Sequence, residues 1–148
     1  MNDQLNFLQT TLHSEIPLTR QMGIRVADYS GSELFVHADL APNINIHGTA
    51  FGGSLYSICA AACWGLLHLK LMEQQVAAQI VLAEGEIKYR RPVREDILVR
   101  CSLPDSESYD RFIYRARQDR KAAITLDAEI LAGNRQAVVF KGHFSSAG

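Results

Sequence analysis

The spacing of apolar residues near the start of the chain changes from helical to alternating. Residues 2–14 carry apolar side chains at helical spacing, which predicts a short N-terminal helix that Pro17 ends. Residues 23–30 and 33–40 then alternate between apolar and polar positions on either side of a Ser-Gly-Ser turn. This pattern predicts two strands joined as a hairpin.

A second helix is predicted from about Gly52 to Met72, and it is apolar on nearly every side. No Asp, Glu, Lys or Arg occurs from Leu40 to Leu69, so the composition resembles that of a membrane span. The purely apolar part is short, however, and Ser57 interrupts it, which favours the core helix of a globular domain. We therefore expect other elements to cover this helix on every side.

The remainder of the chain alternates as strands do and is interrupted by turn residues. The predicted strands span residues 78–92, 96–103, 109–119, 122–131 and 136–144. Because consecutive strands with short links pair antiparallel, we expect an α+β fold in which one antiparallel sheet wraps around the long apolar helix, the hot-dog architecture. A single domain of this kind accounts for residues 1–148, and its open sheet edge and uncovered apolar surface predict a dimer.

Charge and cysteine content exclude several classes of protein. Lysine and arginine number 15 against 16 aspartates and glutamates, so no excess charge would attract nucleic acid or an acidic membrane. The N-terminus lacks the basic and apolar regions of a signal peptide. The three cysteines cannot all pair with one another, so we expect the protein to lie in the reducing cytoplasm. Cys59 and Cys63 share a helix face without a histidine-rich motif nearby, so we interpret them as buried apolar residues and expect no metal site.

The segment NINIHGTAFGGSLY, residues 43–56, places asparagines, a histidine and glycines directly before the apolar helix. The first N–H groups of a helix have no partners within the helix, so this segment is suited to binding an anion or an oxyanion. A loop of this composition is also typical of an ordinary turn, in which an asparagine satisfies its own backbone.

This segment, extended to NINIHGTAFGGSLYSICAAACWGLL and followed by EGEIKYRRPV, resembles the hot-dog thioesterase family typified by the C-terminal domain of YiiD-type proteins. The resemblance covers about residues 17–144. It implies acyl thioesters of coenzyme A or acyl carrier protein (ACP) as substrates, with the coenzyme A or phosphopantetheine group as part of the substrate and no separate cofactor. Some members are malonyl-ACP decarboxylases that help to start fatty acid synthesis, and a homodimer or a dimer of dimers is expected.

Broader hot-dog thioesterases carry an Asn, a His-Gly-Gly sequence six residues later, and an acidic residue seven positions beyond the last glycine. In this chain Asn45 falls on the asparagine, the Phe-Gly-Gly sequence at 51–53 falls on His-Gly-Gly, and Ala60 falls on the acidic position. The carboxylate that those enzymes use as base or nucleophile is therefore missing. Hydrolysis needs an activated water or a nucleophile, whereas decarboxylation of a malonyl thioester needs donors that stabilise an enolate.

We therefore expect decarboxylation of malonyl-ACP to acetyl-ACP, with Asn45, His47 and Gly53 as catalytic residues. The Asn45 amide and the Gly53 N–H would donate to the enolate oxygen, while His47 would polarise a carbonyl or act as a base, unless it is a structural donor of the loop. The expected substrate-binding residues are Thr49, Phe51, Gly52, Ser54, Glu84, Lys88, Arg90 and Arg91. Thr49 and Ser54 are equally suited to capping the helix.

Charged residues in the strand that follows the helix leave two alternatives open. Glu84 and Glu86 share a strand face with Lys88 and Arg90, which is typical of a solvated face, unless one glutamate enters the cleft and replaces the missing base. A dense basic group suits a phosphate or an acidic carrier protein, and its members are Lys88, Arg90, Arg91 and Arg94. It is also an ordinary charged strand end, because Glu95 and Asp96 balance it.

Two other functions remain open on the sequence alone. One is hydrolysis of acyl-CoA or acyl-ACP, and the other is a dimer that binds acyl thioesters without turning them over. Release of free thiol would indicate a thioesterase, release of CO2 without thiol would indicate a decarboxylase, and release of neither would favour a binding protein.

Overall fold

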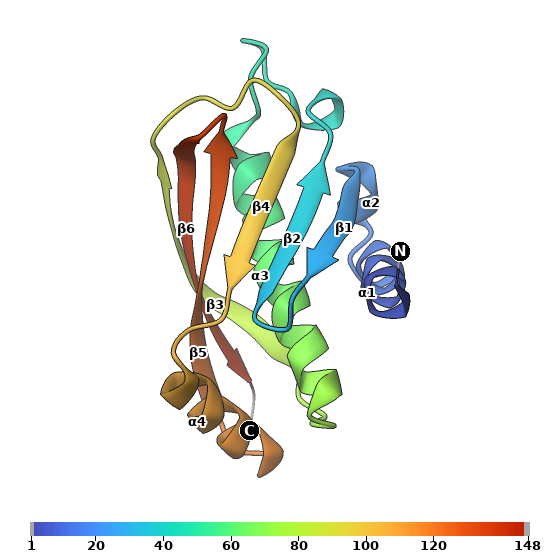
Figure 1. Cartoon of the computed structure of the whole chain (residues 1–148), viewed down its shortest axis with the longest axis vertical. Coiled ribbons are helices and arrows are strands. Elements are labelled where there is room, and N and C mark those ends of the chain that lie inside the picture. Colours follow the sequence, from blue (N-terminus) through green and yellow to red (C-terminus); the bar gives the residue numbers. More distant parts are fainter. Residues whose placement is uncertain (1, 147–148) are drawn as a thin grey trace.

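The computed structural model describes residues 2–146 and shows one sheet curled around one long helix (Figure 1). In chain order the elements are α1 (Asp3–Glu15), α2 (Leu18–Gln21), β1 (Ile24–Tyr29), β2 (Glu33–Ala38), η1 (Ala41–Asn43), α3 (Gly52–Glu73), β3 (Ile80–Tyr89), β4 (Ile97–Ser102), α4 (Ser106–Arg117), β5 (Ala122–Ala132) and β6 (Arg135–Ser146). Every pair of neighbouring strands is antiparallel. The predicted α+β architecture is therefore confirmed.

The strand order in the sheet is β1-β2-β4-β5-β6-β3, so β1 and β3 are its edges. The predicted hairpin is present as β1 and β2, in which Val26 pairs with Val36. The expectation that consecutive strands pair is wrong for β3, because β3 pairs with β6 and not with β4. Short links favour local pairing, but the link between β3 and β4 carries the chain from one edge of the sheet to its middle.

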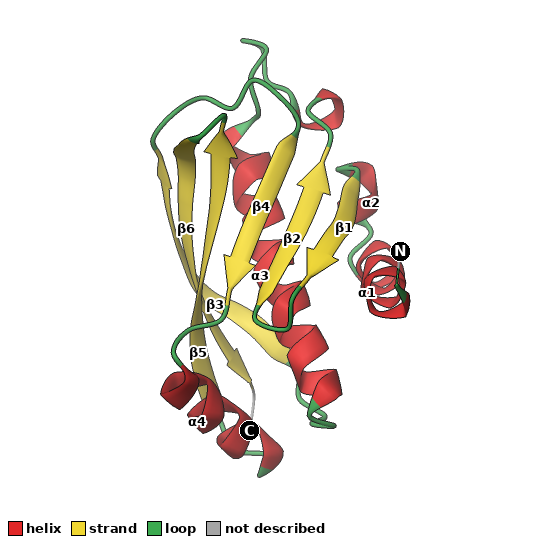
Figure 2. Cartoon of the chain, in the orientation of Figure 1, coloured by secondary structure: helices red, strands yellow, loops and turns green. Residues whose placement is uncertain are grey.

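Helix α3 packs against the inner face of the sheet (Figure 2). Ile58 and Leu66 on this helix are fully buried. Its length and composition would allow it to cross a membrane, yet most of its apolar stretch is buried inside the protein, as expected of a core helix. One stripe of α3 remains only partly buried, comprising Tyr56, Ser57, Ala60, Trp64 and His68. The expectation that α3 is covered on every side is thus wrong along this stripe.

The segment 109–119, predicted as a strand, is instead helix α4 as far as Arg117, followed by a turn. Asp105 caps the start of this helix, because its side chain accepts a hydrogen bond from the Ser108 N–H at 2.9 Å. Phe112, Ile113 and Ala116 are its buried residues, and they follow a helical period rather than an alternating one. Residues that resembled a turn before a strand therefore form the N-cap and first turn of a helix.

Helix α1 covers one side of the core near the edge strand β1. Asn2 caps it by accepting a hydrogen bond from the Leu5 N–H at 2.9 Å, and the helix buries Leu5, Leu8 and Leu12. The predicted helix at 2–14 is thus present at Asp3–Glu15.

A glycine is required at Gly85 in β3 because the side chain of Tyr56 on α3 lies very close to it. A Cβ atom at this position would lie 1.9 Å from the phenol oxygen of Tyr56. Any side chain at Gly85 would therefore push Tyr56 away from β3.

Candidate active site at the start of α3

The first turn of α3 leaves backbone donors without partners. Phe51 occupies the N-cap position with an extended backbone and provides no side-chain hydrogen bond. The Leu55 N–H is the first in the helix to bond back to the chain, to the Phe51 carbonyl at 3.0 Å. Within residues 2–146, the N–H groups of Gly52, Gly53 and Ser54 donate to no other group. They therefore form a positive end that is able to bind a carbonyl oxygen or an anion.

Two cavities meet beside this helix start. The first, of about 390 Å³, contains Gly53, Ser54 and Phe51. The second is an apolar groove of about 290 Å³ that runs along the partly exposed stripe of α3. Both share Leu18, Met22 and Ser57 in their walls, so the helix start opens directly into the groove.

The groove is lined mainly by apolar side chains from four parts of the chain. α3 contributes Tyr56, Ala60 and Trp64, β3 contributes Leu82, β6 contributes Phe144, and residues between 16 and 22 form the opposite wall. The Trp64 ring stacks on the His68 ring at a centroid distance of 4.8 Å, and burial lowers the pKa of His68. Neutral histidine and tryptophan rings thus extend the apolar face of α3 beyond the groove.

A third cavity, of about 320 Å³, lies on another side of the same helix start. It contains Gly52, Tyr89, Arg90 and Arg91. The Tyr89 hydroxyl donates to the Gly52 carbonyl at 2.8 Å, so the end of β3 is fastened to the first residue of α3. Two of the predicted basic residues, Arg90 and Arg91, therefore line a cavity that also contains the first residue of α3.

The three cavities share one electrostatic property. Among the described residues, none that lines them is an aspartate or a glutamate. Their polar members are neutral hydroxyls and amides, together with the two arginines. In these three cavities the described chain therefore has no carboxylate that could activate a water as a base.

Asn45 holds the loop that precedes α3. Its Nδ2 donates to Thr49 Oγ1 at 2.8 Å, and its Oδ1 accepts the N–H groups of His47 at 2.8 Å and Thr49 at 3.1 Å. This is the turn arrangement that the sequence left open, although the second Nδ2 hydrogen remains available for another acceptor. Asn45 and Thr49 thus form one hydrogen-bonded unit, and neither of them lines the three cavities.

His47 lies at the exposed tip of this loop and lines none of the three cavities. Its neighbour Ile46 is 94% exposed, which is unusual for a large apolar side chain. Within its own chain, His47 is therefore not positioned as a base for the helix start.

Asn43 is a site residue that the sequence analysis missed. It is 2% exposed, and its Nδ2 donates to the carbonyls of Met22 at 2.9 Å and Asp39 at 2.8 Å. Its backbone carbonyl accepts the Phe51 N–H at 2.7 Å, so Asn43 fixes the position of the N-cap. Two asparagines in one loop gave no sequence signal as to which one would be buried.

Glu84, Glu86 and Lys88 lie on the outer face of the sheet, opposite α3. A bulge between Leu82 and Glu84 reverses the alternation of β3, so that Glu84 pairs with His143 of β6. The idea that a glutamate enters the cleft to replace the missing base is therefore wrong for the chain's own cleft. Lys88 does not line the cavity that contains Arg90 and Arg91.

The buried thiols do not serve as nucleophiles. The prediction that Cys59 and Cys63 are buried is confirmed, and Cys101 is buried with them. Burial raises the pKa of the Cys59 and Cys63 thiols well above the ordinary value. A neutral, inaccessible thiol is unreactive.

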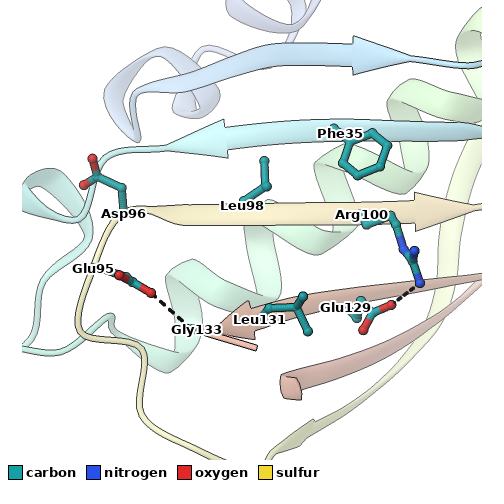
Figure 3. A pocket seen from close by; sticks show the side chains of 8 residues that line it. All are labelled: Phe35, Glu95, Asp96, Leu98, Arg100, Glu129, Leu131 and Gly133. Atoms are coloured by element: carbon teal, nitrogen blue, oxygen red, sulfur yellow. Dashed lines mark hydrogen bonds and ion pairs between the residues drawn. The ribbon is translucent and has the colours of Figure 1, made fainter. Parts of the chain in front are cut away.

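The cavity in Figure 3 lies on the outer face of the sheet and differs in chemistry from the site at α3. It has about 390 Å³, and the apolar side chains of Phe35, Leu98 and Leu131 lie within it. Its rim is acidic, and the side chains there are engaged: Glu129 is paired with Arg100 at 2.5 Å. It has neither the helix start nor the neutral lining that an acyl thioester would need.

Comparison with known proteins agrees with this geometry. The family described as "Putative thioesterase (yiiD_Cterm)" matches residues 5–147. The chain belongs to this YiiD C-terminal family. The resemblance noted in the sequence is therefore confirmed, and the membership supports acyl-thioester processing as the class of activity.

Solved structures place the YiiD C-terminal family chain among hot-dog proteins. It is similar to a protein from Shewanella oneidensis named as a putative thioesterase, with 34% identity, complete coverage of both chains and a TM-score of 0.91. A protein of unknown function from Chlorobaculum tepidum is 33% identical, with 99% of each chain covered and a TM-score of 0.89. A probable thioesterase from Pseudomonas aeruginosa, at 19% identity over 96% of this chain and 94% of its own, has a TM-score of 0.79 and shows the shared fold.

Proposed function

We propose that this YiiD C-terminal family protein decarboxylates malonyl-ACP to acetyl-ACP, a reaction that supplies a starter for fatty acid synthesis. The supporting observation is that the unpartnered N–H groups of α3 open into cavities that contain no carboxylate of the described chain. Such a site stabilises a developing oxyanion without supplying a base for water.

In the proposed reaction the thioester carbonyl oxygen lies at the N–H groups of Gly53 and its neighbours. The bond between the α-carbon and the carboxylate carbon breaks, CO2 leaves, and the electron pair forms a thioester enolate. The helix start and the remaining Nδ2 hydrogen of Asn45 stabilise the enolate oxygen. The α-carbon then takes up one proton, and the product is the acetyl thioester.

The apolar groove contributes to the same step. A carboxylate that leaves water for a groove beside Ala60 loses hydration, whereas the CO2 that forms is neutral and needs none. Breaking the bond is therefore favoured in the groove. An acidic residue at position 60, as in broader thioesterases, would repel the substrate carboxylate from this place.

Tyr56 is the group in the groove best suited to return the proton. Its hydroxyl makes no hydrogen bond within the described chain and lies over Gly85 of β3. The neighbouring hydroxyl of Ser57 already donates to the Gly53 carbonyl at 2.9 Å. We assign proton return to Tyr56 or to a water that it holds.

Arg90 and Arg91 would bind the phosphate of the carrier's phosphopantetheine arm, since both line the cavity beside Gly52. We further propose a cytoplasmic homodimer, or a dimer of such dimers, that pairs through the open edge of β3 and covers the exposed stripe of α3. The exposed Ile46 would then contact the second subunit. The site would thus lie at the seam between subunits.

Hydrolysis of longer acyl thioesters is the second candidate. The observation in its favour is the apolar groove, whose volume of about 290 Å³ exceeds what a malonyl carboxylate fills. A partner subunit would have to supply the base. A binding protein without turnover is the third candidate.

One assay separates the three. Purified protein is incubated with malonyl-ACP, malonyl-CoA, acetyl-CoA and medium-chain acyl-CoA, and CO2 and free thiol are both measured. The proposal predicts CO2 from the malonyl thioesters at a rate at least about tenfold above any thiol release, because hydrolysis here lacks a general base, whose contribution is typically roughly 10²–10⁴-fold. Thiol release from medium-chain acyl-CoA, with no CO2 from the malonyl thioesters, would replace the proposal with hydrolysis. Release of neither product would favour a binding protein without turnover.

A further inference from the structure

A histidine and two glutamates converge on the outer face of the sheet, where β3 pairs with β6. Glu84 lies directly opposite His143, and Glu86 lies on the same face two residues along β3. The Nε2 atom of His143 is 2.6 Å from Glu86 Oε2 and 3.8 Å from Glu84 Oε2. One ligand atom from each of the three residues lies within 4.8 Å of the others.

The bulge in β3 is what creates this cluster. Without it, the alternation from Leu82 on the inner face would turn Glu84 and Glu86 towards α3. Bulges often redirect side chains at functional positions. Here the bulge removes two carboxylates from the cleft and presents both of them to one imidazole.

Thr125 of β5 fixes the orientation of the imidazole. Its Oγ1 lies 2.8 Å from Nδ1 of His143. When the Nδ1 hydrogen is donated to Thr125, the lone pair of Nε2 points towards the two glutamates. Histidine ligands of metals are held in this way by an oxygen on the other ring nitrogen.

The distances suit a small divalent ion. Two ligand atoms at about 2.0–2.1 Å from a tetrahedral zinc ion lie about 3.3 Å apart. The two Nε2–carboxylate distances of 2.6 Å and 3.8 Å lie on either side of that value. A change of less than about 1 Å in each of these two distances would bring it to the value of a tetrahedral zinc site.

Charge points in the same direction. Lys141, the nearby ammonium group of β6, is bonded to Asp127 at 2.8 Å. Over residues 2–146, neither Glu84 nor Glu86 forms an ion pair with a lysine or an arginine. Lys141 is the cross-strand partner of Glu86 and attracts it, but among the described residues only His143 lies within ion-pair distance of the two carboxylates.

We propose that Glu84, Glu86 and His143 bind a divalent transition-metal ion, for which zinc is the best fit. One imidazole nitrogen with carboxylate oxygens favours zinc over magnesium or calcium, which prefer all-oxygen sites. Three protein ligands leave one position for water. The ion would fasten the edge strand β3 to β6, on the face of the sheet opposite the proposed catalytic cavities.

A second cluster in the chain has similar residue types but is not suited to a metal. His37 directs Nδ1 towards Asp39 and Nε2 towards Asp96, both at 3.9 Å, so no single nitrogen faces both carboxylates. The Arg25 guanidinium lies 2.8 Å from Nδ1 and is paired with Asp39 at 3.3 Å. An arginine already fills the place of a cation, which makes His37 a matched control.

The test is zinc titration of chelator-treated, untagged protein at pH 7.5, followed by calorimetry and by thermal unfolding. Wild type is expected to bind one Zn²⁺ per chain and to unfold at a higher temperature with zinc. His143→Gln is expected to weaken binding by at least about a hundredfold, and Thr125→Val by about tenfold to a hundredfold. His37→Gln is expected to bind zinc like wild type.

Cobalt provides a readout of direct ligation. Wild type with Co²⁺ should show the visible absorption of a site with four or five ligands, and Glu86→Gln should change or abolish it. Equal zinc binding by wild type and His143→Gln, or no binding at equimolar zinc, would overturn the site. Loss of zinc binding in His37→Gln would show that the metal binds at the cluster of His37, Asp39 and Asp96 and would also overturn the proposed site. None of these outcomes bears on the proposed decarboxylation, which uses the opposite face of the sheet.

Discussion

The two ends of α3 differ in whether the backbone N–H groups there have hydrogen-bond partners. At the C-terminal end the N–H groups of Gln74, Gln75 and Val76 bond back to helix carbonyls, with Gln75 in the left-handed conformation at a φ of 57°. At the N-terminal end, the first three N–H groups have no partner within residues 2–146, and Phe51 provides no cap. One end of the helix is closed by its own chain, and the other is left open.

Side chains extend the same contrast. Lys70 donates to the Gly31 carbonyl at 2.8 Å and pairs with Glu73 at 3.0 Å, while the Tyr29 hydroxyl donates to Glu73 at 2.6 Å. Burial, followed by the hydrogen bond to Glu73, raises the pKa of Tyr29 far above its ordinary value. The closed end thus stabilises the fold, whereas the open end retains donors for a ligand. An uncapped helix start is a cost in stability that a binding site explains.

The largest effect is expected from a charge at the open end. Ala60→Asp places a carboxylate beside the substrate carboxylate, and at about 4 Å this repulsion is worth about 4 kcal/mol, roughly a thousandfold in rate. Decarboxylation of malonyl-ACP, measured at pH 8 where the new carboxyl is ionised, should fall accordingly while the protein remains folded.

Ala62→Asp is the matched control for this charge. Ala62 is fully buried, whereas Ala60 borders the groove. An unpaired charge in the core should unfold the protein, which circular dichroism would detect. Equal solubility and folding of both variants, together with full activity of Ala60→Asp, would contradict the placement of the groove and of the substrate.

Removing a donor from the open end should have the next largest effect. Asn45→Ala should cost about 2.7–4 kcal/mol of transition-state stabilisation, seen as a loss of kcat. Thr49→Val keeps the Asn45 amide and removes one of its three loop hydrogen bonds, the one to Thr49 Oγ1, so a mild effect is expected. If both variants lose kcat equally, Asn45 acts by holding the loop and is a positioning residue.

A smaller effect is expected from the basic residues beside the open end. Reversal of both Arg90 and Arg91 to glutamate should raise KM for malonyl-ACP by about tenfold, and the difference should shrink at high salt. Lys88→Glu, on the outer face, should leave KM unchanged. Kinetics that respond to Lys88 but not to the arginines would show that the carrier docks elsewhere.

The smallest effect, and none on catalysis, is expected at the closed end. Burial by itself would raise the pKa of Glu73, but hydrogen bonds from Tyr29 and Lys70 outweigh it and hold the pKa below its ordinary value. A lowered folded-state pKa means that Glu73 stabilises the protein above its unfolded pKa, about 4.3, and that this contribution is lost as the pH falls through the folded value.

Glu73→Gln should therefore lower the free energy of unfolding by about 1 kcal/mol at pH 7 and leave kcat and KM intact. The difference from wild type should shrink below about pH 4.3. Denaturant unfolding at several pH values measures it. A difference that persists unchanged in acid would show that packing, not charge, links Glu73 to Tyr29.

Local patterns in the sequence determined much of this protein. The apolar period of α3, the alternation of β1 and β2, and the amide-rich loop before Gly52 each depend on neighbours close in the chain, so periodicity and composition predicted them. The burial of Cys59 also followed from its place in this apolar helix, whereas the missing acid at Ala60 followed from the resemblance to hot-dog thioesterases. The segment of α4 was misread because a short run of mixed apolar and charged residues fits both periods until the Asp105 cap is recognised.

Tertiary structure alone decided the rest. The pairing of β3 with β6 is a contact between segments distant in sequence, and no local pattern encodes it. That pairing and its bulge turned Glu84 and Glu86 away from the cleft and towards His143. Packing against Met22 and Asp39 likewise determines that Asn43 is buried, whereas Asn45 stays partly exposed. Local preference acts between neighbours along the chain, whereas the face on which a charged side chain lies depends on register and packing between distant segments.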